Sequence, residues 1–110
     1  MSSVRITSTD PTFAPTKAKD VELPYYQQVS GKPAYRLIVP GDFYGYVYWN
    51  PLFSQYEYEF EDLAGSDYAV WRAAGGVISG DYAPVVGNDA VGTATITAID
   101  DIFCHMEFNA

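Results

Sequence analysis

The sequence contains a single cysteine, Cys104, and a single histidine, His105. One cysteine excludes an intrachain disulfide, and the two side chains together are too few for a tetrahedral zinc site. The alternating pattern of residues 102–108 predicts a strand, in which neighbouring side chains point to opposite faces, so the two cannot meet as a catalytic dyad. We therefore expect Cys104 to be a core residue and the protein to bind no metal or other cofactor.

Long apolar segments are missing as well. No run approaches the length that crosses a bilayer, and the first residues, MSSVRITSTDPTF, contain no apolar stretch typical of a secretory signal. We expect a protein that neither enters a membrane nor is exported by the general secretory route. At 110 residues, 48% of them hydrophobic, the chain is long enough for one domain with a single core.

Basic residues are scarce beyond the N-terminal third of the chain. Residues 1–36 carry five Lys or Arg and three acidic residues, whereas residues 37–110 carry Arg72 alone against eleven acidic residues, for a net charge of −8 overall. This asymmetry indicates a basic arm on an acidic body, although a charge that serves only solubility is the alternative. Because an acidic body repels phosphate, nucleic acid is not an expected partner.

Residues 1–33 predict an extended N-terminal arm. They are rich in Ser, Thr, Pro and Lys, and four prolines interrupt any strand ladder, although VRIT (4–7) and VELPYYQQV (21–29) have the composition of short strands. Such an arm orders either against its own body or against a neighbour. We expect Arg5, Lys17 and Lys19 of this arm to bind a partner.

Alternating patterns separated by turns predict a single β-rich domain over residues 34–110. AYRLIV (34–39), the tyrosine-rich stretch after PGD (40–42), QYEYEFED (55–62), VGTATITAI (91–99) and IFCHMEF (102–108) are typical of strands, with hairpin turns expected at Gly80-Asp81 and within 85–91. The segment GSDYAVWRAAGG (65–76) favours one or two helical turns over a strand. The predicted fold is mainly β: a small antiparallel β-sandwich or barrel with at most one short helix.

The stretch GDFYGYVYWNP (41–51) places Tyr44, Tyr46 and Tyr48 on one face of a strand. The opposite row is more apolar and is the expected core face, with Gly45 marking a bulge or a close backbone approach. We expect the three tyrosines to bind a partner, since outward tyrosines suit a protein or sugar surface. The alternative is that a loop or the arm covers them.

Three glutamates share one face of residues 55–62. This row, Glu57, Glu59 and Glu61, indicates a solvated face, where a catalytic carboxylate with a raised pKa is not expected. The acidic turns GSD, SGD and GND lack the ligand spacing of a calcium loop. We therefore expect no catalytic residue.

Residues 74–98, AGGVISGDYAPVVGNDAVGTATITA, resemble a GGV-SGD-VV-VG-A pattern found in the small capsid cement, or head decoration, proteins of tailed phages. The resemblance implies a non-catalytic virion protein, assembled in the host cytoplasm, that binds the major capsid protein on the outside of the shell, often as a trimer. Its arm would add a strand to a sheet edge of the shell protein. The matching residues are Gly75, Gly76, Val77, Ser79, Gly80, Asp81, Val85, Val86, Val91, Gly92 and Ala94.

Two other classes of function compete with capsid decoration. One is a carbohydrate-binding module that stacks sugars on the three tyrosines and Trp49. The other is an acidic inhibitor that mimics nucleic acid through five carboxylates, which are Glu57, Glu59, Glu61, Asp62 and Asp67.

Overall fold

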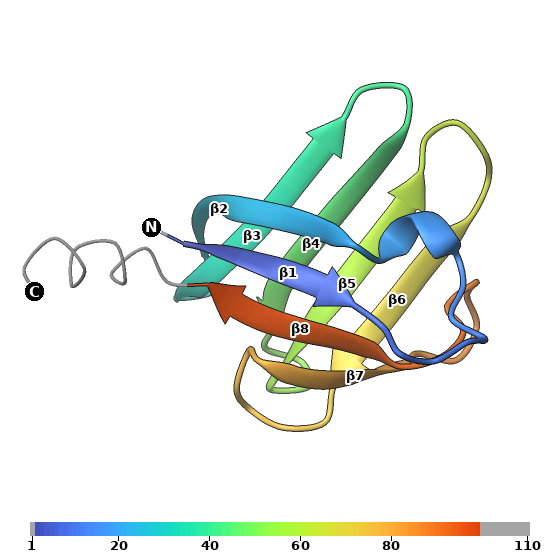
Figure 1. The fold of residues 1–110 in the computed structure, drawn as a ribbon. Helices are drawn as coiled ribbons and strands as arrows, with labels where there is room; N and C mark the ends of the chain where they lie inside the picture. The colour runs from blue at the N-terminus through green and yellow to red at the C-terminus, as the bar shows by residue number, and fades with distance from the viewer. Residues whose placement is uncertain (1, 100–110) are drawn as a thin grey trace, which may run out of the picture.

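The protein is an eight-stranded antiparallel barrel in which each strand pairs with its neighbours in the sequence and β1 closes the sheet against β8 (Figure 1). The computed structural model describes residues 2–99. It confirms the mainly β fold, as a barrel, with one short 3-10 turn. The elements are β1 (Ser3–Thr7), η1 (Thr16–Ala18), β2 (Val21–Val29), β3 (Lys32–Val39), β4 (Phe43–Asn50), β5 (Gln55–Asp62), β6 (Tyr68–Ala73), β7 (Gly80–Pro84) and β8 (Ala94–Ile99).

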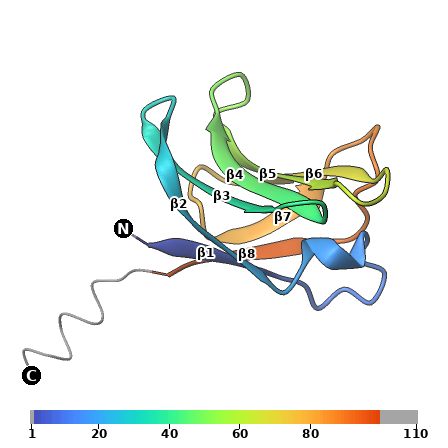
Figure 2. The same ribbon diagram turned by 90° about the horizontal axis from the view of Figure 1, so that it is seen from above.

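The barrel has two walls whose strands cross one another. Figures 1 and 2 place β2, β1, β8 and β7 in one wall and β3, β4, β5 and β6 in the other. Side chains of both walls fill the space between them, and the largest fully buried ones are Trp71, Tyr58, Tyr82 and Phe60. The interior is therefore the core, and the outward side chains of both walls form the surface of the barrel.

The N-terminal segment, residues 1–33, takes the first of its two expected arrangements, so it is not an arm that stands apart from the body. The segment orders against its own body: β1 pairs with β2 on one side and with β8 on the other, and Arg5 lies opposite both Glu22 and Thr97. Val4 and Ile6 are fully buried in the interior. The prolines do not prevent this: Pro11 and Pro15 lie in the connection between β1 and β2, and Pro24 and Pro33 lie within β2 and β3, opposite Ser3 and Gln28.

The connection from β1 to β2 covers one end of the barrel. Phe13 stacks on Trp71 with ring centroids 5.1 Å apart, and Tyr58 stacks on the other side of Trp71 at 5.3 Å. The polar atoms of this stack are satisfied, since Trp71 donates from Nε1 to the carbonyl of Gly92 and Tyr58 donates to the carbonyl of Ala18. Gly92 has φ +80°, and a Cβ there would lie 3.0 Å from Cα of Phe13, so the stack requires glycine.

Two local predictions for residues 65–81 are also wrong. Residues 68–73 form a strand rather than a helix, because Ala69, Trp71 and Ala73 alternate into the core while the backbone pairs with β5 and β7. Gly80 and Asp81 begin β7 instead of forming a two-residue turn, and the loop precedes them. The Tyr82 hydroxyl holds this loop by donating to the carbonyl of Ile78. The strand predicted over 102–108, which includes Cys104 and His105, lies outside the described residues.

The apolar row of β4 faces the core as predicted. Phe43, Gly45 and Val47 are all buried. Gly45 keeps the regular register with both neighbouring strands, so it marks no bulge. A Cβ at Gly45 would lie 3.5 Å from the Leu23 side chain, which occupies that part of the interior.

Ile6→Ala should lower the free energy of unfolding by about 3 kcal/mol, because it leaves a cavity in a filled core. Arg5→Ala, the matched change on the outer side of the same strand, should cost less than about 0.5 kcal/mol. Urea denaturation of both variants measures the difference. Equal, small effects would mean that β1 is a dispensable arm.

Candidate functional site: the tyrosine face

The outward side chains of β3 to β6 form one continuous surface, which we call the tyrosine face. Its centre is a ladder of three rungs, each made of a tyrosine from β4, a glutamate from β5 and the residue of β6 that lies opposite that glutamate. The first rung holds Tyr48, Glu57 and Arg72, the second Tyr46, Glu59 and Val70, and the third Tyr44, Glu61 and Tyr68.

The three tyrosines of β4 are brought together as predicted and contact one another. Tyr46 and Tyr48 stack with centroids 4.7 Å apart and an interplanar angle of 15°, and Tyr44 lies 6.0 Å from Tyr46 at 50°. Desolvation by burial raises the pKa of all three hydroxyls above the usual value for tyrosine. They are therefore neutral hydrogen-bonding groups at physiological pH, suited to binding rather than to nucleophilic attack.

Two residues that the sequence pattern did not indicate extend the face beyond β4. The guanidinium of Arg36 in β3 lies 3.7 Å from the centroid of the Tyr26 ring, a cation–π contact. Tyr26 in turn meets Tyr46 edge-on, with centroids 6.3 Å apart. A register shift in β2 between Tyr25 and Gln27 gives Tyr26 this position, and the sequence alone contains no signal for it.

The first rung is a closed ion-pair network, and it corrects the prediction that all three glutamates lie on a solvated face. Glu57 is only 4% exposed. Arg72 donates from Nε to Glu57 Oε2 at 2.6 Å, and Tyr48 donates to Oε1 at 3.0 Å. The ring of Phe53, from the loop between β4 and β5, lies 3.7 Å from the Arg72 guanidinium and covers the pair.

The second and third rungs are more open. Tyr68 is 44% exposed, Glu61 is exposed and Glu59 is half-buried. The Tyr68 hydroxyl donates to Glu59, and desolvation, followed by this bond, raises the pKa of Tyr68. Among residues 2–99, neither Glu59 nor Glu61 has a Lys or Arg within ion-pair distance. These two rungs are the part of the ladder that remains available to another molecule.

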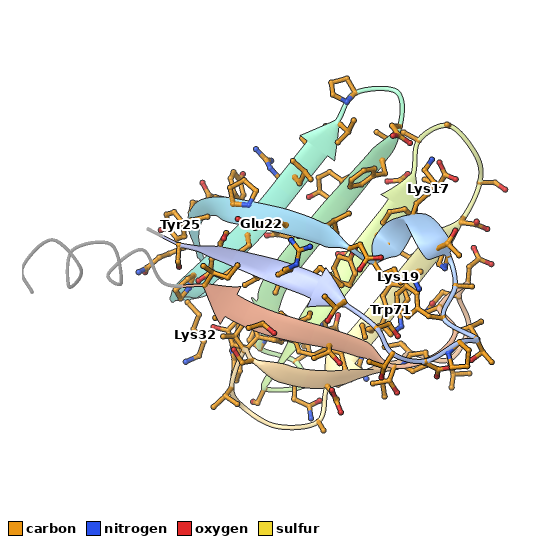
Figure 3. All side chains as sticks on the ribbon, viewed as in Figure 1. Lys17, Lys19, Glu22, Tyr25, Lys32 and Trp71 are labelled. Carbon is orange, nitrogen blue, oxygen red and sulfur yellow. The ribbon has the colours of Figure 1, made fainter. Side chains whose placement is uncertain are left out.

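The basic residues expected to bind a partner are not part of this face. Lys17 lies within η1 and Lys19 directly after it, at the covered end of the barrel (Figure 3). Arg5 is on β1. Lys17 bridges two acidic residues, with Nζ 2.6 Å from Asp42 and 2.9 Å from Asp62. The hydrogen bond to Asp42 contributes most to raising the pKa of Lys17, followed by the hydrogen bond to Asp62. The ammonium group of Lys17 therefore has a structural role within the chain.

Apolar side chains are also exposed at the loops. Leu52 is 86% and Val86 98% exposed, and a depression of about 440 Å³ lies between β6 and β7 next to Arg72. In the described chain no helix has the length and hydropathy needed to span a membrane. Residues 2–99 likewise contain no group of three or more His, Cys, Asp or Glu arranged to hold a metal ion.

Comparisons with known proteins add no relative to this picture. No family model, no curated protein and no solved structure matches the chain.

Arg72→Met should lower the free energy of unfolding by about 3 kcal/mol, because it leaves the carboxylate of Glu57 buried without its ion pair. Adding Glu57→Gln should recover most of that loss, since the amide is neutral. The measurement is a double-mutant cycle by urea denaturation. A double variant as unstable as Arg72→Met alone would show that Arg72 acts through packing against Phe53 instead.

Proposed function

We propose that this protein is a non-enzymatic structural protein of a virion that decorates or stabilises a phage capsid by binding its shell through the tyrosine face. The observation that carries the proposal is the set of contiguous outward tyrosines on a rigid, paired sheet. Tyrosine supplies large contact area and a neutral hydrogen-bonding group with little loss of side-chain entropy, and it is enriched at protein interfaces. The resemblance of residues 74–98 to head decoration proteins supports the choice of partner.

The proposed binding does not use the N-terminal segment as an added strand in a sheet of the shell protein. β1 and β2 are part of the wall, where each strand of the closed barrel pairs with two neighbours, so the N-terminal segment is not free to add a strand to a neighbouring sheet. Binding therefore uses side chains of one face. Many weak contacts repeated over a shell lattice gain from avidity, so each face needs only modest affinity.

The geometry of the rings argues against a sugar platform. Tyr46 and Tyr48 cover each other's faces, and the planes of Tyr44 and Tyr26 are tilted from Tyr46 by 50° and 72°. Trp49 is on the opposite side of β4, where it packs edge-on against Tyr56. No single plane is left on which a sugar ring would stack.

The arrangement of the carboxylates argues against mimicry of nucleic acid. Glu57 is buried with Arg72, and Asp62 is paired with Lys17, whose hydrogen bond lowers the pKa of Asp62. Two of the five carboxylates are therefore already paired within the chain. Those that remain are too few to imitate a run of phosphates.

Co-sedimentation with shells assembled from the major capsid protein of the same genome tests the proposal. The protein should bind in a fixed ratio to shell subunits. Tyr44→Ser/Tyr46→Ser should weaken this binding by at least about tenfold, because buried tyrosines at an interface dominate its energy.

Arg5→Ser/Thr97→Ser, which changes two outward residues of the opposite wall, is the control and should bind as the wild type does. Circular dichroism confirms that each variant is folded. Absence of the wild-type protein from sedimented shells would refute the function, and equal binding by both double variants would refute the role of the face.

A further inference from the structure

The three rungs of the ladder have the same design but differ in one position. In each, a tyrosine of β4 and a glutamate of β5 lie directly opposite one another. The residue of β6 that completes the rung is Arg72 in the first, Val70 in the second and Tyr68 in the third. The first rung is therefore the one with a cation at its β6 position, while on the other side of β4 Arg36 lies opposite Tyr46 of the second rung.

We propose that the second and third rungs receive an arginine side chain of the partner, held between Tyr44 and Tyr68 and paired with Glu61 and Glu59. The inference rests on the proposed function in taking the tyrosine face as the contact surface. It adds the chemistry of the partner, which is a segment that carries arginine.

The first rung shows how this sheet holds a guanidinium. The carboxylate of Glu57 accepts from Arg72 and from a tyrosine hydroxyl, while an aromatic ring covers the cation. In the third rung Glu61 has tyrosines on both sides, Tyr44 on β4 and Tyr68 on β6. Paired carboxylate and aromatic groups are what a planar guanidinium binds, through charge-assisted hydrogen bonds and contact with the ring face.

The charge of the surface favours the same occupant. The cations near the tyrosine face are already engaged, because Arg36 lies over Tyr26 and Arg72 is paired with Glu57. Glu59 and Glu61 have no basic partner among residues 2–99. A cationic segment complements this part of the face, whereas an acidic or purely apolar segment would leave two carboxylates desolvated without a cation.

The test is an NMR titration of the full chain with an acetylated pentapeptide of alternating glycine and arginine. The peptide should shift the ring resonances of Tyr44 and Tyr68 and the amide of Glu61. Its counterpart with citrulline, which is neutral and similar in shape, should not. Glu59→Gln/Glu61→Gln should weaken binding of the arginine peptide by roughly threefold to tenfold, the range for two exposed ion pairs.

Glu22→Gln/Asp81→Asn removes the same charge from β2 and β7 and should leave the affinity unchanged. An equal loss in this control, binding of the citrulline peptide, or no effect of Glu59→Gln/Glu61→Gln would each overturn the inference. Because Glu59 accepts a bond from Tyr68, Glu61→Gln alone serves as a second variant and should also weaken binding.

The co-sedimentation experiment with capsid shells distinguishes failure of this inference from failure of the proposed function. Shells that still bind while the arginine peptide does not would refute the arginine site and leave capsid decoration intact. A peptide that binds as described while shells do not would support the site and refute capsid decoration.

Discussion

The closure of the sheet by β1 is the constraint on which the rest of the structure depends. Ser3–Thr7 pairs along its length with β8 and along most of it with β2, so every strand of the barrel has a paired neighbour on both sides. Closure also fixes the alternation of side chains, with Val4 and Ile6 inward and Arg5 outward. The connection that follows β1 then brings Phe13 onto Trp71 and covers one end of the core.

The position of the proposed binding surface follows from the same constraint. A closed barrel of this size is filled by its own side chains. Here the buried tyrosines and Trp71 occupy the interior, which is therefore the hydrophobic core. The proposed binding surface is on the outside, where the register of β4, β5 and β6 places tyrosines beside glutamates in three rungs. The first rung contains the ion pair of Arg72 with Glu57, whereas Glu59 and Glu61 in the other two have no basic partner among residues 2–99.

The sequence predicts some of this arrangement because alternation is a local signal. The strand at 55–62 and the core row of β4 could be predicted from the alternation of apolar residues with other side chains. Alternation reports only the side of the sheet on which a residue lies. It cannot show that Glu57 is covered, since its partner Arg72 comes from another strand and Phe53 from a loop.

The remaining differences arise from contacts between distant parts of the chain. Residues 65–76 carry local signals for a helix, but pairing of residues 68–72 with β5 and of residues 71–73 with β7 makes them a strand. The predicted arm is a wall strand because Arg5 lies opposite Thr97, a partner at the far end of the described chain. No window of local sequence contains that information.

Hydrogen exchange of the isolated protein, read by NMR at each amide, tests the closure most directly. The account predicts that the ladder amides of β1 and β8 exchange as slowly as those of β4 and β5, through global unfolding. It also predicts cross-strand contacts between Arg5 and Thr97. Fast exchange across residues 3–7 beside a slowly exchanging β4 and β5 would mean that the barrel is open and that the N-terminal segment is an arm after all.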